Sequence, residues 1–162
     1  MNIGKLEGGE INPRAENGAQ DVKLPEQAGG YKDLNNLPDE AEVPLRQGSS
    51  YKGLESDDPS AQGKDRHHVP AKSAYRDSGL DSDDGPCIRM ERIDHRQTAS
   101  YGVSDEAKEY RAAQSQLIAQ GKFREAQQMD IDDIRMKFGK KYDGAIAEML
   151  EYTDQLEQEG RI

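Results

Sequence analysis

Long apolar runs, paired cysteines and a surplus of positive charge are all missing from this sequence. The chain has 162 residues with one Cys and no Trp, and its 22 Lys and Arg against 32 Asp and Glu give a net charge of −10. A single cysteine excludes an intramolecular disulfide and any four-cysteine zinc site. No apolar run reaches the roughly 18 residues of a membrane span, and the N-terminus lacks the basic-then-apolar pattern of a cleaved signal peptide. We therefore expect no membrane insertion, and any export would need separate delivery machinery.

Hydrophobic side chains are also scarce. They make up 33% of the residues, and aromatic ones make up 6%. Together with the net charge, this composition approaches that of disordered proteins and excludes a large β-rich core. Much of the apolar total comes from Ala, Tyr and Met, which suit small helices better than sheets. We expect an α+β fold that is mostly α.

The chain changes character after Lys64. Residues 1–64 hold 9 of the 16 Gly and 5 of the 7 Pro, and their apolar residues never recur at a helical or strand period. We expect this part to be a largely irregular linker or tail, because its few apolar residues do not offset the entropy of ordering the chain. The alternative is that segments such as residues 31–37 wrap onto the folded part or onto a partner. We expect the folded domain to span residues 65–162.

Three helices are expected in the last third of the chain. Ser104 is a suitable N-cap for the first, over about residues 104–120, and Gly121 ends it. The second covers residues 123–138, as one helix or as two short ones, and the third has an apolar stripe over residues 142–156. The opposite face of that last helix is acidic, and it is either solvated or a docking face.

All three histidines, His67, His68 and His95, flank a short strand that the alternation of residues 87–93 predicts. Imidazole accepts a proton near neutral pH and also binds divalent metals, and phosphodiester hydrolysis needs both a base for water and a cation beside the phosphate. In an extended dipeptide, the side chains of the adjacent pair point to opposite faces, so one can hold a metal while the other meets water or substrate. The cluster favours a metal-dependent hydrolase site.

The residues around these histidines resemble a known family. The run DRHHVP from Asp65 to Pro70, a loop, a strand and then IDHRQTASYG over residues 93–102 are similar to the HNH or His-Me finger (ββα-metal) nucleases. The likeness covers about residues 60–150 and is strongest with the double-His nuclease modules at the C-terminal ends of bacterial polymorphic toxins. It implies a small core of short strands and a helix around one divalent metal ion, followed by about three helices.

The resemblance also implies roles for particular side chains. His68 matches the general base of the family, and His67 and His95 match its metal ligands. Asp94 and Asp65 are further candidates as metal ligands or as supports of the site.

Two arginines stand next to these histidines. Arg66 and Arg96 are candidates to bind phosphate oxygens through bidentate hydrogen bonds. Pairing with nearby carboxylates is an equally good interpretation of both side chains.

The sequence departs from the HNH pattern in ways that bear on the metal. No Asn stands at an obvious middle position, and Ala99 lies four residues after His95, where many members have another metal-binding histidine. Two imidazoles, at most one carboxylate, and water favour a labile octahedral ion, Mg²⁺ or Mn²⁺. Zn²⁺ or Ni²⁺ are the alternatives, because imidazole prefers the later metals.

These observations predict a metal-dependent endonuclease, with DNA favoured over RNA by the resemblance alone. The resemblance further implies an antibacterial effector toxin that is secreted or injected, acts in the cytoplasm of the target cell and is neutralised by a cognate immunity protein. The negative net charge opposes nucleic-acid binding, but residues 65–101 are close to neutral, and a local basic patch with a divalent ion can hold a phosphate. The alternative prediction is a non-enzymatic helical interaction module with an acidic docking face and at most a structural metal.

Overall fold

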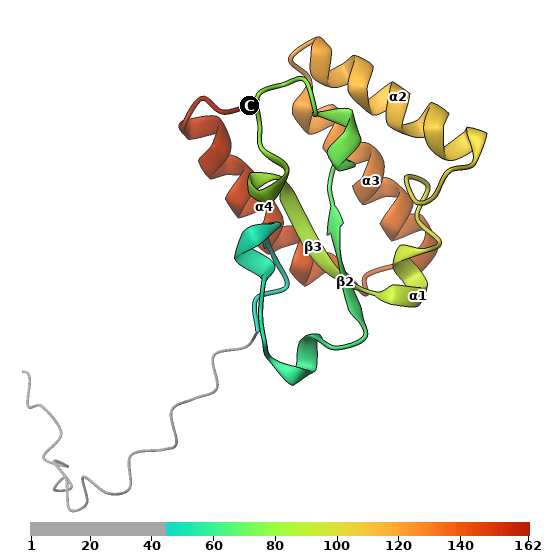
Figure 1. Ribbon diagram of the computed structural model, residues 1–162, viewed down its shortest axis with the longest axis vertical. Coiled ribbons are helices and arrows are strands. Elements are labelled where there is room, and N and C mark those ends of the chain that lie inside the picture. Colours follow the sequence, from blue (N-terminus) through green and yellow to red (C-terminus); the bar gives the residue numbers. More distant parts are fainter. Residues whose placement is uncertain (1–44) are drawn as a thin grey trace, which may run out of the picture. The chain divides into compact units, whose positions relative to one another are not determined.

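The computed structural model describes residues 45–162. Within this range the chain forms a three-stranded antiparallel sheet and four α-helices, which confirms the expected α+β class with mostly α content (Figure 1). The strands are β1 (Gly48–Ser50), β2 (Lys64–His68) and β3 (Pro86–Glu91), and β3 lies in the middle of the sheet. None of the helices in this part of the chain has the length and apolarity that crossing a membrane requires.

The central strand β3 overlaps the predicted segment of residues 87–93 and begins one residue before it, at Pro86. Its residues Pro86 to Met90 are all buried, as expected for a strand with neighbours on both edges, and its only proline stands at the first position. On β2, His67 pairs with Ile88 and His68 pairs with Cys87. The expected end at residue 93 is too late, because the chain turns after Glu91 into the short helix α1 (Arg92–His95).

The predicted helices are present. Helix α2 (Asp105–Ala119) begins at the expected cap, where the Ser104 hydroxyl accepts a hydrogen bond from the backbone N–H of Ala107 at 3.2 Å. Helix α3 (Phe123–Phe138) is continuous rather than two short helices. The physical reason is that Asp130 is buried and accepts a hydrogen bond from Gln114 at 2.8 Å, so its carboxylate does not cap a new helix.

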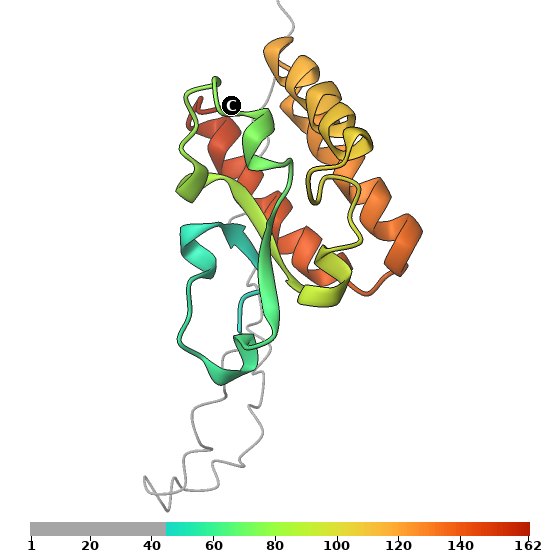
Figure 2. The same cartoon turned by 45° about the vertical axis from the view of Figure 1, so that its right-hand side comes forward.

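Helix α4 (Asp143–Gln158) carries the apolar stripe that the sequence indicates. Figures 1 and 2 show α3 and α4 against the same face of the sheet, with α2 packed on α3. The main core joins the end of β2, β3, α3 and α4. Its buried residues are Val69, Ile88, Met90, Ile131, Ile134, Tyr142, Ala145, Ile146 and Met149.

The expected domain boundary at residue 64 needs correction, because residues 45–64 belong to the same compact unit as the helices. Strand β1 pairs with β3, and the Glu148 carboxylate on α4 accepts hydrogen bonds from the backbone N–H groups of Gln47 and Gly48 at 2.7 and 2.8 Å. These backbone interactions need few apolar residues, so the composition of the segment gave no sign of them. The rest of the predicted tail, including residues 31–37, lies outside the described residues.

Candidate active site

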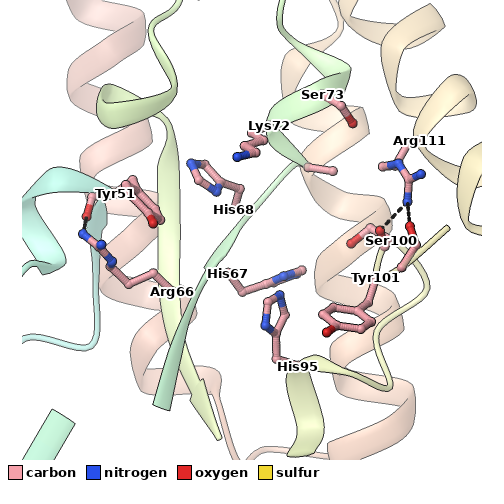
Figure 3. A pocket seen from close by; sticks show the side chains of 12 residues that line it. Tyr51, Arg66, His67, His68, Lys72, Ser73, His95, Ser100, Tyr101 and Arg111 are labelled. Carbon is pink, nitrogen blue, oxygen red and sulfur yellow. Dashed lines mark hydrogen bonds between the residues drawn. The ribbon is translucent and has the colours of Figure 1, made fainter. Parts of the chain in front are cut away.

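The three histidines line one open cavity of about 350 Å³ (Figure 3). Strand β2 supplies His67 and His68, and α1 supplies His95. The other walls come from the short 3-10 turn η3 (Lys72–Ala74), from residues 100–102 and from the first half of α2. Side chains far apart in the sequence therefore meet at one place, as the histidine cluster predicts.

His67 and His95 form a close pair. Their ring centroids are 5.0 Å apart, with the ring planes inclined by 64°. His67 is only 3% exposed, and its Nε2 has no hydrogen-bond partner among the described residues. Burial, with smaller contributions from His95 and His68, lowers the pKa of His67 to about 3. The His67 ring is therefore neutral at physiological pH, which is the form that binds a metal ion.

Asp65 acts on His95 rather than on a metal. Its carboxylate lies 3.0 Å from Nδ1 of His95 and accepts a second hydrogen bond from Nε of Arg92 at 3.1 Å. Burial raises the pKa of Asp65, but the hydrogen bonds from His95 and Arg92 outweigh it and hold that pKa below its ordinary value. An ionised carboxylate at Nδ1 fixes the proton on that nitrogen and leaves Nε2 of His95 as the donor for a metal. Asp65 thus orients the His95 ring.

His68 lies on the opposite side of β2 from His67 (Figure 3). Its Nε2 is 2.9 Å from the carbonyl oxygen of Ser82 in the 3-10 turn η4 (Ser82–Asp84). Because a carbonyl only accepts, Nε2 carries the proton, and Nδ1 is the nitrogen that can take one up. Burial, reinforced by Lys72 and Arg66, lowers the pKa of His68. The ring is therefore neutral and able to act as a base.

His68 forms a stack with the side chains of Tyr51 and Arg66. The ring of Tyr51 lies 4.5 Å from the His68 ring at an interplanar angle of 13°. The guanidinium carbon of Arg66 is 3.7 Å from the centre of the Tyr51 ring, and Arg66 also donates to the Tyr51 carbonyl at 3.0 Å. Sequence reasoning missed Tyr51, because it lies in a segment whose composition is typical of a linker.

Three predicted site residues do not line the cavity: Asp65 contacts His95 from outside it, and Asp94 and Arg96 lie elsewhere. Asp94 is buried and accepts hydrogen bonds from Nζ of Lys141 and from the hydroxyl of Tyr142, both at 2.6 Å. Arg96 follows α1 with an exposed side chain and does not line the cavity. Both positions turn away from the cavity because successive helical residues differ by about 100° in direction. Asp94 ties α1 to the start of α4 instead.

The charged side chains that line the cavity are of one sign. Arg66, Lys72 and Arg111 line it, and no Asp or Glu does so in the described part of the chain. One nitrogen of Arg111 donates to the carbonyls of Ser100 and Gly102, at 2.7 and 3.0 Å. Sequence reasoning missed Lys72 and Arg111, because neither stands beside a histidine.

The donor set bears directly on the metal that it can hold. Among the described residues, no group of three or more His, Cys, Asp or Glu side chains is placed to bind one ion. A closed structural zinc site of four protein ligands therefore does not fit. An open site for a labile divalent ion would need only the two imidazoles of His67 and His95 from the protein, with its other ligands taken from water and substrate.

Comparison of the chain with protein-family models, with curated proteins and with solved structures gives no match in any of the three. The geometry of the cavity and the residue pattern around the histidines are therefore the features of this chain that bear on its function.

Proposed function

We propose that the protein is a metal-dependent nuclease that hydrolyses phosphodiester bonds, with DNA as the favoured substrate. The observation that carries the proposal is the lining of the cavity: three imidazoles and three cations, with no carboxylate, in a chain of net charge −10. A cavity of this sign attracts an anionic ligand, and neutral imidazoles beside it supply the base and the metal donors that phosphodiester hydrolysis needs.

In this proposal the two histidines on opposite sides of β2 have different roles. Nδ1 of His68 takes the proton of the attacking water, while the Ser82 carbonyl holds the opposite nitrogen as the proton donor. His67 and His95 would hold a divalent cation, with Mg²⁺ or Mn²⁺ favoured, and Asp65 orients His95. Such a cation, when bound, stabilises the negative charge that develops on the phosphate.

The cations of the cavity complete the assignment. Arg66, Lys72 and Arg111 line the cavity, and in this proposal they bind phosphate oxygens of the substrate. Arg66 is already held over the Tyr51 ring, so its guanidinium loses little freedom when a phosphate binds.

The biological setting belongs to the same proposal. A nuclease of this size with the DRHHVP pattern is consistent with an effector toxin delivered into a competing bacterium and neutralised by a cognate immunity protein. Expression of the chain in the bacterial cytoplasm should then stop growth, and His68→Ala should abolish that toxicity. Unimpaired growth at a verified level of folded protein would contradict the toxin assignment but not the hydrolase assignment.

The direct test is cleavage of nucleic acid by the purified full chain. We expect supercoiled plasmid to be nicked and linearised with Mg²⁺ or Mn²⁺ and to remain intact with a chelator. A matched pair of variants locates the activity: Arg66→Gln should weaken cleavage, whereas Arg96→Gln, which alters an exposed arginine outside the cavity, should not. Failure to cleave DNA or RNA with any of the four candidate metals would overturn the proposal.

A further inference from the structure

We infer that Tyr152 and Arg161 are positioning residues for His68. They anchor the turn whose carbonyl orients the imidazole. The catalytic meaning of this inference rests on the proposed nuclease function, but the structural link between these residues is independent of it.

The first step is the dependence of His68 on η4. The hydrogen bond between Nε2 of His68 and the Ser82 carbonyl is the contact that decides which ring nitrogen is free to accept a proton. The turn itself is closed only by local hydrogen bonds, from Asp84 N–H to Asp81 at 3.1 Å and from Gly85 N–H to Ser82 at 3.2 Å. Its shape is therefore self-contained, while its position depends on what ties it to the rest of the fold.

The second step is the tie from α4. The hydroxyl of Tyr152 donates to the Asp84 carbonyl at 2.7 Å, and the guanidinium of Arg161 donates to the Asp84 carboxylate at 2.7 Å. Both interactions end on one residue of the turn, two positions after Ser82. Figure 1 shows the C-terminal end beside the segment that connects β2 to β3, which contains this turn. Tyr152 of α4 and Arg161, just after that helix, thereby add two side-chain ties to a turn whose long-range backbone hydrogen bond runs from the Tyr51 N–H to the Gly85 carbonyl at 2.9 Å.

The third step is the tight fit between the turn and the ring that it orients. A side chain on Gly85 would overlap the hydroxyl of Tyr75, and its Cβ would lie 3.1 Å from Cδ2 of His68. Tyr75 is buried against Leu156 of α4, in a smaller hydrophobic cluster that also contains Leu80 and Phe123. With no spare room between turn, Tyr75 and His68, a shift of η4 must move the imidazole or break its hydrogen bond.

The experiment uses the full chain with Tyr152→Phe, Arg161→Gln and the double variant. The chain has three histidines, so the ring ¹⁵N signals of His68 can be assigned separately. In the wild type we expect one tautomer, protonated at Nε2. In the double variant we expect averaged tautomer shifts and a 10- to 30-fold lower kcat with an unchanged KM, because substrate-binding cations are untouched. Arg161→Lys should restore most of the loss.

Arg124→Gln is the matched control. It removes the ion pairs of Arg124 with Asp154 and Glu157 on the same helix α4, without any contact to η4. We expect it to leave the His68 signals and kcat unchanged. Unaltered His68 ring signals in a folded double variant would overturn the inference. If the wild type cleaves no nucleic acid, the nuclease proposal fails, and the ring signals still decide whether Tyr152 and Arg161 position His68.

Discussion

The sheet half of the protein and its helical half use their polar side chains in opposite ways. Around β2 and α1, imidazole and cationic groups face an open cavity, and His67 Nε2 has no partner in the described residues. Between the helices, polar groups face one another: Gln114 donates to Asp130 at 2.8 Å, and Gln127 donates to Thr153 at 2.9 Å, although Oδ1 of Asp130 and Oε1 of Gln127 have no partner among the described residues. The two halves differ in where their polar groups face: groups at an open cavity are available to a ligand, whereas groups between helices contribute to packing.

The comparison also explains how an acidic protein can carry a site for an anion. Acidic residues of α4 are partly neutralised by Arg124, which pairs with Asp154 and Glu157, whereas the cavity has no carboxylate in its lining. The net charge of a chain therefore does not describe the field at one site. It follows that variants of the side chains that line the cavity or position its histidines should change activity, whereas variants in the packed core between sheet and helices should change stability.

The largest effect is expected for His68→Ala. Removing a general base costs about 10²–10⁴-fold in kcat, and the melting temperature should change little, because His68 belongs to neither hydrophobic cluster. Initial rates of plasmid cleavage and a thermal melt of the same preparation measure the two quantities. A folded variant with full metal-dependent activity would reject the assignment of His68 as the base. A large drop in melting temperature would contradict the claim that His68 serves activity rather than stability.

Gly48→Ala should produce the largest loss of stability. A Cβ at this position would overlap the carbonyl of Ala145 and crowd the backbone of Met149, because β1 lies directly against α4. We expect the free energy of unfolding to fall by roughly 3 kcal/mol, measured by urea denaturation. The control is Gly144→Ala on α4, where the new methyl group meets nothing within 4 Å and should stabilise the helix by about 0.5–1 kcal/mol. Equal effects of the two variants would contradict the close approach of β1.

Asp130→Asn tests the paired polar core through its pH dependence. Burial raises the pKa of Asp130 from 3.8 to about 7, against the hydrogen bond from Gln114, and the nearby Asp133 adds to the rise. The folded state therefore keeps a proton that the unfolded state loses, so stability falls as the pH rises from about 4 to about 7. This shift corresponds to at most about 4 kcal/mol.

We expect Asp130→Asn to raise the free energy of unfolding at pH 8 by about 2 kcal/mol, which is about half of the stability lost through the pKa shift. The gain is only half because the amide N–H that replaces Oδ1 has no acceptor, just as Oδ1 has no partner among the described residues. Urea denaturation at pH 5 and pH 8 measures the effect, and the pH dependence should flatten in the variant. Asp132→Asn, at an exposed neighbour on α3, is the control. A wild-type stability that rises between pH 4 and pH 7 through this carboxylate would contradict the burial argument.

The smallest effect is expected for Asp65→Asn, which keeps the size of the side chain but removes its charge. Loss of a carboxylate that orients a metal-binding histidine lowers metal affinity by about 10–100-fold. Calorimetric titration with Mn²⁺ measures it, and the melting temperature should change little, because the carboxylate is partly exposed. An unchanged affinity would show that Asp65 does not support a ligand.

The helices and the strand β3 could be predicted from the sequence because their signals are local. The stripe that runs through Ile146 and Met149, the cap at Ser104 and the stop at Gly121 all act within a few residues. The ordering of residues 45–64 could not be predicted in the same way. Strand β1 is held by a carboxylate one hundred residues away in the chain and by close backbone packing on α4, and neither leaves a periodic pattern.

The candidate site also combines features that local sequence predicts with features that only tertiary packing decides. The grouping of His67, His68 and His95 could be predicted from their proximity in sequence, and the strand explains why the adjacent pair faces two ways. The outward turn of Arg96 and the internal role of Asp94 depend on the turn from β3 into α1, and the sequence pattern placed the end of that strand two residues too late. Tyr51, Lys72 and Arg111 enter the cavity only through tertiary packing.

The most direct measurement is a titration of the full chain with Zn²⁺, a diamagnetic ion, followed by the ring ¹⁵N signals of its three histidines. The account predicts that one equivalent shifts one nitrogen each of His67 and His95 into the range of metal-bound imidazole. It also predicts that His68 keeps its free Nδ1 and its proton on Nε2. Coordination by His68, or no change at His67 and His95 at any metal concentration, would contradict it.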